Sequence, residues 1–172
     1  MESTDVLVIG SGIAGLCAAI EAARTGATVT VASAGKTMSG SSFFPGTWGL
    51  GLIGPVDEDD EQDLIDTILA VGGGVADPEL VQTFVHGIPQ AIDWLEQDLG
   101  VELQRPQSAK SAQQKQFIPC FDHKTRMWRG LTRKPLEDAL TTWIESLGIR
   151  LLPRHELIDL VEDTVSYTHL RA

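Results

Sequence analysis

A short, continuous apolar run near the N-terminus predicts a buried β-strand. Residues 6–9 read Val-Leu-Val-Ile, with no polar position among them. Such a run is typical of a strand in a parallel sheet that is covered on both faces. Further strands are predicted at residues 29–32 and 149–152, so the chain begins as an α/β fold with a parallel sheet.

Helical periodicity fills the interval between the first two strands. Gly26 follows the periodic segment at the position expected for a helix C-cap. The apolar positions at helical spacing are Ile13, Leu16, Cys17 and Ile20.

Three spaced glycines join the first strand to this helix. Gly10 permits a tight turn, Gly12 lets the backbone approach a pyrophosphate, and Gly15 lets the helix pack close to the strand. Free N–H groups at the start of the helix would then face the phosphates. The pattern predicts a dinucleotide-binding βαβ unit, and the alternative is an ordinary crossover with a glycine-rich turn. The predicted cofactor-binding residues are Gly10, Ser11, Gly12, Ile13, Ala14 and Gly15.

The end of the second strand lacks the acidic residue that usually accepts hydrogen bonds from the adenosine ribose. Residues 31–36 read Val-Ala-Ser-Ala-Gly-Lys, so Ser33 and the adjoining Ala34 stand at this position. Ser33 could bind the ribose as a neutral partner, which disfavours NAD. Lys36 suggests either a 2′-phosphate contact or, more commonly, a solvated surface residue.

The next segment resembles a second cofactor loop. Residues 36–55 are rich in glycine, serine and aromatic residues, and include Gly-Ser-Ser at 40–42 and Gly-Thr-Trp-Gly at 46–49. These resemble the loop that passes under FAD in the succinate dehydrogenase, fumarate reductase and L-aspartate oxidase family. The aspartate oxidases also have serine at the second-strand position. The resemblance implies contacts to FAD from Ser41, Ser42, Thr47 and Gly49.

One substitution in this loop concerns how FAD is held. Membrane-complex members of the family attach FAD covalently through a histidine, and Ser41 occupies that position here. A serine hydroxyl cannot form the histidyl link, so the resemblance implies non-covalent FAD.

The resemblance extends over about residues 4–163. It implies a Rossmann-like FAD-binding βαβ domain with a helical excursion, truncated before the capping domain. We expect the βαβ unit and flavin loop at residues 1–56, the excursion at 57–130, and a helix with return strands at 131–163. Residues 164–172 abandon the strand pattern, and we expect them to be foreign sequence joined to the chain, the alternative being a natural frayed terminus.

Local signals predict the elements of the excursion and of the return. The acidic run 57–63 opens a helix to about Val71 as a solvated N-terminus. Asp77 caps a second helix with Pro78 in its first turn. Further helices are expected at residues 89–98 and 135–147, and a strand at 156–161.

Residues 122–134 form the most basic stretch of the chain. Its arginines could bind a dicarboxylate substrate, because arginine pairs with carboxylates in a bidentate manner. A solvated loop that offsets acidic neighbours is the interpretation that we favour.

Charge and cysteine usage restrict the partners. With 13 basic and 24 acidic residues the net charge is −11, which disfavours nucleic acid and anionic lipid. No stretch is long and apolar enough to span a membrane, so a cytoplasmic protein is expected. Cys120 and His123 have the spacing of half a metal site without a second pair, and no metal is predicted.

The sequence therefore indicates the FAD-binding N-terminal portion of an oxidoreductase. The whole enzyme would transfer a hydride between FAD and a small-molecule substrate, a dicarboxylate or an amino acid. Its catalytic residues are expected beyond this chain, which alone would be inactive. The alternatives are an electron-relay subunit of the anaerobic glycerol-3-phosphate dehydrogenase type and an NAD(P)H-dependent reductase. Electron acceptor and partner subunit stay open.

Overall fold

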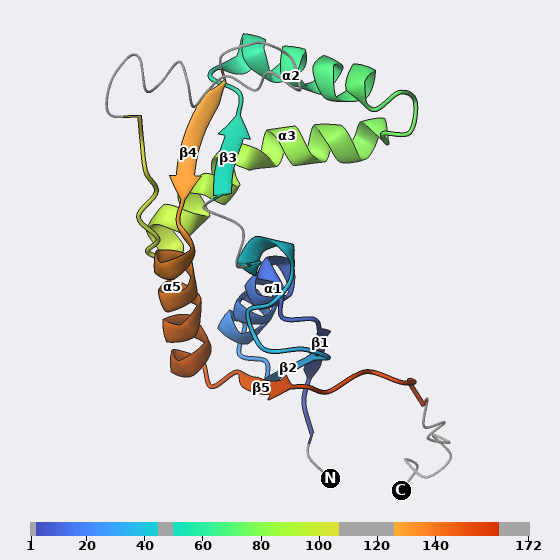
Figure 1. Cartoon of the computed structure of the whole chain (residues 1–172), viewed down its shortest axis with the longest axis vertical. Coiled ribbons are helices and arrows are strands. Elements are labelled where there is room, and N and C mark those ends of the chain that lie inside the picture. The colour runs from blue at the N-terminus through green and yellow to red at the C-terminus, as the bar shows by residue number, and fades with distance from the viewer. Residues whose placement is uncertain (1–2, 45–49, 107–125, 162–172) are drawn as a thin grey trace, which may run out of the picture. The chain divides into compact units, whose positions relative to one another are not determined.

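A computed structural model describes residues 3–44, 50–106 and 126–161 (Figure 1). The chain divides into two compact units, which are described separately. Residues 1–40 together with 147–172 form the first unit, and residues 41–146 form the second.

The first unit is a parallel sheet with one crossover helix. Its elements are β1 (Val6–Ile9), α1 (Ile13–Arg24), β2 (Val29–Ser33) and β5 (Arg150–Pro153). The strand order is β1-β2-β5, and both neighbouring pairs are parallel. This arrangement confirms the predicted α/β fold and its third parallel strand. At the end of α1, Gly26 has a φ of 93°, as expected for the residue that ends a helix.

The face of α1 that packs on β1 and β2 is apolar, and Leu16, Ala19 and Ile20 are fully buried there. Cys17 is only partly buried. The prediction that β1 is covered on both faces is wrong for the described residues. Leu7 and Ile9 alternate with the valines of β1 and are 44% and 50% exposed. Side chains alternate across a strand, so a helix on one face cannot cover both sets.

The second unit combines helices with a two-stranded ribbon. Figure 1 shows α2 and α3 as an antiparallel hairpin beside strands β3 and β4. Its elements are the 3₁₀ turn η1 (Ser41–Phe43), β3 (Leu50–Gly54), α2 (Glu58–Val71), α3 (Pro78–Asp93), the π-turn η2 (Trp94–Asp98), β4 (Met127–Leu131) and α5 (Arg133–Ser146). Buried residues from α2, α3, η2 and α5 line its core, among them Leu64, Ile65, Val81, Val85, Ile88, Ile92, Leu95, Leu99, Leu136, Leu140 and Ile144.

Strands β3 and β4 lie where the sequence predicted loops. They pair antiparallel from Leu50 opposite Leu131 to Gly54 opposite Met127. The loop at residues 36–55 was predicted from its glycine, serine and aromatic content and that at 122–134 from its basic charge, but in the ribbon the glycines make room for the indole ring of Trp128. A Cβ atom on Gly51 would lie 2.9 Å from that ring, and one on Gly130 only 2.3 Å. The glycines are thus part of how the ribbon packs.

The sequence predicted that a new helix begins at Pro89, but a single helix, α3, runs through this residue. Helix α3 begins after its Asp77 cap, as predicted, but it continues through Pro89 to Asp93, and η2 follows directly. Proline removes one backbone hydrogen bond within a helix. The buried stripe of Val81, Val85, Ile88 and Ile92 continues across it, so packing on one face outweighs that loss.

The strand predicted at residues 156–161 is absent from the described part of the chain. Leu157 and Ile158 are instead 41% and 94% exposed. An alternating pattern becomes a strand only when a neighbour supplies hydrogen bonds, and no described segment pairs with these residues. The predicted tail, 164–172, lies outside the described residues.

Candidate functional site

The strand-to-helix turn in the first unit has the backbone that its glycines predict. Gly10 has a φ of 107°, a conformation that favours glycine, and its N–H donates to the carbonyl of Ala32 at 2.8 Å. Gly12 is the N-cap of α1, with an extended backbone. The turn therefore continues from the carboxyl end of β1 straight into the helix.

Gly12 and Gly15 are glycines for different reasons. A Cβ on Gly15 would lie 2.1 Å from the carbonyl oxygen of Gly10, so Gly15 is needed for the packing of the turn itself. A Cβ on Gly12 would meet only Ser39 among the described residues, at 3.7 Å from its carbonyl oxygen, which is an ordinary contact. Its φ of −71° suits any residue. The protein's own packing therefore does not require glycine at position 12. A phosphate that approaches the protein backbone closely would require it, because a side chain there would block the approach.

The N-terminus of α1 differs from those of α2 and α3. Asp57 caps α2 by accepting from the N–H of Asp60, and Asp77 caps α3 by accepting from two N–H groups. Helix α1 has no side-chain cap and no acidic residue in its first turn. Its first N–H groups, at residues 13–15, have no partner within the helix. The N-terminus of α1 thus offers N–H donors to an anion, and the positive end of the helix dipole lies there as well.

Two buried hydroxyls join this turn to the end of β2. Ser11 and Ser33 are 2% and 6% exposed, and their Oγ atoms lie 3.0 Å apart. Ser11 Oγ also lies 3.3 Å from the carbonyl oxygen of Lys36, within hydrogen-bond distance. The neighbouring Ala34 is exposed. The structure therefore brings together the predicted phosphate-binding turn and the predicted ribose-binding residue.

Residues after β5 brace the loop that follows β2, which sequence reasoning missed. The N–H of Arg154 donates to the carbonyl of Gly35, and the N–H of His155 donates to that of Ser33, both at 2.9 Å. These are main-chain bonds between segments far apart in the sequence, so no residue type signals them. They fix the backbone that carries Ser33.

The predicted second cofactor loop is only partly described. Ser41 and Ser42 form most of η1 in the second unit, and the carbonyl of Ser41 accepts from the N–H of Phe44 at 3.4 Å. Thr47 and Gly49 lie outside the described residues. The contacts of all four residues to FAD stay predictions.

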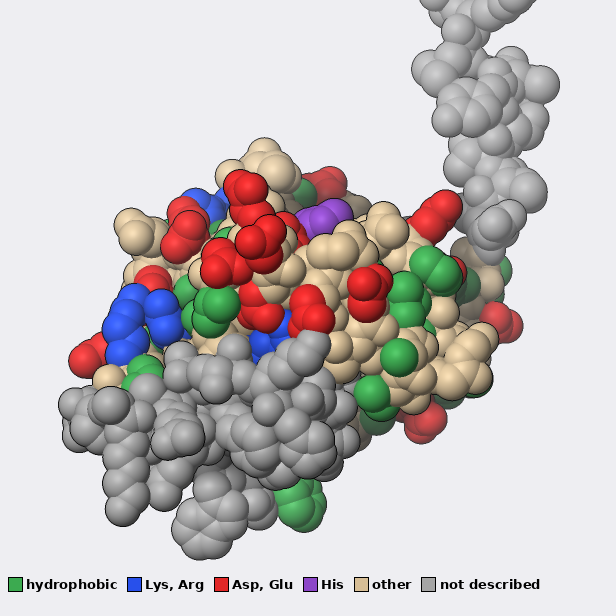
Figure 2. Space-filling model, turned by 90° about the horizontal axis from the view of Figure 1, so that it is seen from above, with side chains coloured by type: hydrophobic (Ala, Val, Ile, Leu, Met, Phe, Trp, Pro, Cys, Tyr) green, Lys and Arg blue, Asp and Glu red, His purple; other side chains and the backbone are tan. Residues whose placement is uncertain are grey.

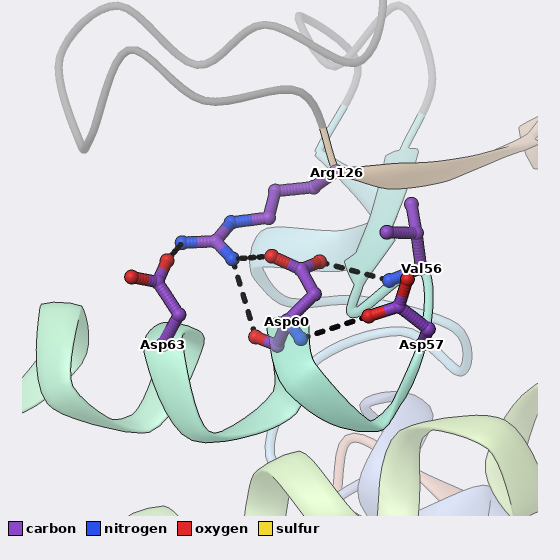
Figure 3. Close-up of polar contacts among 5 residues, drawn as sticks. All are labelled: Val56, Asp57, Asp60, Asp63 and Arg126. Atoms are coloured by element: carbon purple, nitrogen blue, oxygen red, sulfur yellow. Dashed lines mark hydrogen bonds and ion pairs between the residues drawn. The ribbon is translucent and has the colours of Figure 1, made fainter.

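The acidic run is not uniformly solvated, and the described part of the basic stretch, residues 126–134, is not a solvated loop, because it contains β4 and the start of α5. Figure 3 shows Arg126 extending from the start of β4 to the first turns of α2. Its buried guanidinium pairs with the carboxylates of Asp60 and Asp63. Asp60 also accepts from the N–H of Val56 at 2.8 Å. The positive charge of Arg126 thus offsets acidic neighbours, as expected, but it does so in a buried ion-pair cluster and not in a solvated loop.

The exposed part of the run remains a charged surface. In the first turn of α2, Glu58 and Asp59 are exposed, whereas Asp60 and Glu61 are partly buried. Figure 2, which views the molecule from the side on which α2 lies, shows acidic side chains gathered there. Among the described residues, no cluster of three or more His, Cys, Asp or Glu side chains could hold a metal. Cys120 and His123 lie outside them.

Cys17 lies on α1, and its surroundings disfavour the reactive thiolate form. Burial, with a smaller contribution from the Glu21 carboxylate, raises the pKa of its thiol to about 11. A high pKa keeps the thiol protonated and unreactive. Across the described ranges, no helix has the length and apolarity needed to cross a membrane.

Comparisons with known proteins agree with this geometry. The profile of a family described as FAD binding domain matches residues 5–169. L-Aspartate oxidase of Halobacterium salinarum is 36% identical over 167 residues, which are 95% of this chain and 30% of that protein. Vinyl phenol reductase of Lactiplantibacillus plantarum is 27% identical over 169 residues, 95% of this chain and 32% of that protein.

Solved structures show the same fold. Quinol fumarate reductase of E. coli superposes with a TM-score of 0.67 at 21% identity, over 94% of this chain and 27% of that one. The chain thus spans less than a third of the length of these relatives. It belongs to the family of FAD binding domains found in flavoprotein oxidoreductases related to L-aspartate oxidase and fumarate reductase.

Proposed function

We propose that this chain supplies the adenosine and pyrophosphate half of the FAD site of an oxidoreductase. The open N-terminus of α1 beside Gly12 carries the proposal, because helices α2 and α3 close their own N-termini with aspartate caps. FAD would supply the chemistry by accepting or giving a hydride. This chain's own contribution would be to bind and orient the cofactor.

The pyrophosphate would lie against the first turn of α1. The N–H groups of Ile13, Ala14 and Gly15 would donate to its oxygens, and the helix dipole would favour its negative charge. This local field matters because the chain as a whole carries a net charge of −11. Gly12 would allow the phosphate to approach the backbone.

The adenosine ribose would lie at the end of β2, where Ser33 is proposed to accept a hydrogen bond from a ribose hydroxyl. The two main-chain bonds from Arg154 and His155 hold this strand end in place. A neutral hydroxyl in place of a carboxylate gives a weaker contact. Binding would therefore depend strongly on the phosphates.

FAD is proposed to be held without a covalent bond. Ser41 stands where a linking histidine would be needed, and a hydroxyl cannot replace an imidazole in that link. The proposed substrate is a dicarboxylate or an amino acid, in keeping with the L-aspartate oxidase relative. The proposed compartment is the cytoplasm, where a free thiol such as Cys17 stays reduced.

The test compares two substitutions on the same helix. Gly12→Val places a branched side chain in the proposed phosphate path, and Ala18→Val places the same valine side chain at an exposed position of α1. We expect Gly12→Val to abolish FAD binding, measured as flavin per protein after gel filtration. Ala18→Val should bind like the parent chain, with thermal unfolding showing that both variants fold.

Stoichiometric FAD on the Gly12→Val variant would contradict the phosphate site, and Gly12→Ala repeats the test with a smaller group. Acid precipitation of the flavin-loaded chain checks the linkage. Flavin should appear in the supernatant, and flavin retained in the pellet would contradict non-covalent binding.

A further inference from the structure

The hydroxyls of Ser11 and Ser33 form a relay with a defined direction. Ser11 Oγ lies 3.3 Å from the carbonyl oxygen of Lys36 and 3.0 Å from Ser33 Oγ. A carbonyl oxygen only accepts, whereas each hydroxyl has one proton and two acceptor positions. Because Ser11 has a single proton, both contacts are hydrogen bonds at the same time only when Ser11 donates to the carbonyl and Ser33 donates to Ser11.

This direction leaves Ser33 with acceptor positions only. In that arrangement its proton is used by Ser11, so its lone pairs are the only hydrogen-bonding capacity that the hydroxyl has left for a ligand. Both side chains are more than nine-tenths buried, which strengthens a hydrogen bond relative to water. No acidic side chain occurs at residues 31–36 to compete for a ligand hydroxyl.

We infer that Ser11 is a positioning residue that makes Ser33 an acceptor for a ribose hydroxyl of the adenosine moiety. The relay gives a neutral serine the role that a carboxylate has at the end of the second strand in many dinucleotide sites. The site then selects a ligand that donates a hydrogen bond at this point. This inference rests on the proposed function, because it assumes that adenosine lies at the end of β2.

The experiment measures discrimination between ligands rather than affinity alone. Calorimetric titration of the chain with ADP, 2′-deoxy-ADP and 3′-deoxy-ADP gives the ratio of each deoxy ligand's Kd to that of ADP. For the parent chain we expect one of these ratios to be roughly three- to tenfold, the size of one net hydrogen bond. Ser33→Ala should reduce that ratio to about one.

Ser11→Ala is the decisive variant. With Ser11 gone, the Ser33 proton is free to point elsewhere, so we expect the ratio to fall towards one as in Ser33→Ala. Ser11→Thr keeps the hydroxyl and should restore the parent ratio. A residue that only supports the turn would weaken the binding of all three ligands equally and leave the ratio unchanged.

The outcomes separate this inference from the proposed function. A Ser11→Ala variant with the parent ratio overturns the relay, as does a parent chain that binds ADP and both deoxy ligands equally. A parent chain that binds neither ADP nor FAD overturns the proposed function itself. Thermal unfolding of each variant provides the check on folding.

Discussion

The guanidinium of Arg126 donates to a carboxylate oxygen of Asp63 at 2.8 Å, although the two residues are 63 positions apart. Arg126 is fully buried, and it also donates to the carbonyl and the carboxylate of Asp60. Asp60 is 14% and Asp63 41% exposed. This cluster ties the start of α2 to the start of β4.

Removing Asp60 should be costly because it leaves a buried cation short of a partner. We expect Asp60→Ala to lower the free energy of unfolding by about 3 kcal/mol. The more exposed Asp63→Ala should cost less, about 1 kcal/mol. Chemical denaturation gives both values, and Asp59→Ala, an exposed neighbour in the same helical turn, is the control.

Replacing the cation should rescue the Asp60 variant in part. In the Asp60→Ala background, Arg126→Met removes the unpaired charge and keeps an apolar stem of similar length. The double variant should be more stable than Asp60→Ala alone. If it is less stable, the cost of the single substitution lies in lost helix capping and not in the buried charge.

Gly15 should be intolerant of a side chain for structural reasons. In Gly15→Ala the new Cβ would meet the carbonyl of Gly10 at 2.1 Å, so the turn must open. We expect a loss of stability of about 2 kcal/mol. Gly12→Ala is the matched control, because its Cβ has room, and it should unfold within about 0.5 kcal/mol of the parent chain. Thermal and denaturant unfolding measure both variants. If Gly15→Ala and Gly12→Ala lose the same free energy of unfolding, the distinction between the two glycines is wrong.

The Cys17 thiol should react slowly in the folded chain. Burial and, to a smaller extent, the Glu21 carboxylate together raise its pKa to about 11. At pH 8 we expect alkylation by iodoacetamide to be roughly a hundredfold slower than in denaturant, because the thiolate fraction falls tenfold for each unit by which the pKa rises. A Cys120→Ser background isolates the signal in mass spectrometry. Glu21→Gln should speed the reaction only slightly, and a large gain would show that charge outweighs burial.

Asp5 should make stability depend on pH at the acidic end. Hydrogen bonds from the Thr28 hydroxyl and N–H lower the pKa of Asp5 from its ordinary value of 3.8. The stabilisation is therefore present above that value and is lost as the pH falls through the lower pKa of the folded chain. Thermal unfolding of the parent chain and of Asp5→Asn should differ at pH 6 and converge near pH 2. In a Thr28→Val background the difference at pH 6 should shrink, and an unchanged difference would contradict this origin.

Local sequence patterns determined the first unit and the helix starts. The apolar run of β1, the glycine turn and the periodicity of α1 act within a few residues, so they can be recognised without a three-dimensional partner. The same holds for the caps Asp57 and Asp77, which bind N–H groups two or three positions away. The position of Ser33 at the end of β2 followed from the same spacing.

Only the tertiary structure decided the features that depend on distant partners. Strands β3 and β4 exist because two glycine-containing segments pair around Trp128, and the helix through Pro89 persists because one face is packed. The burial of Arg126 needs carboxylates from another helix. In the candidate site, the sequence predicted Ser11 and Ser33 separately, and only the fold placed their hydroxyls 3.0 Å apart. Burial and hydrogen bonding depend on which segments meet in space, and a short stretch of sequence does not contain that information.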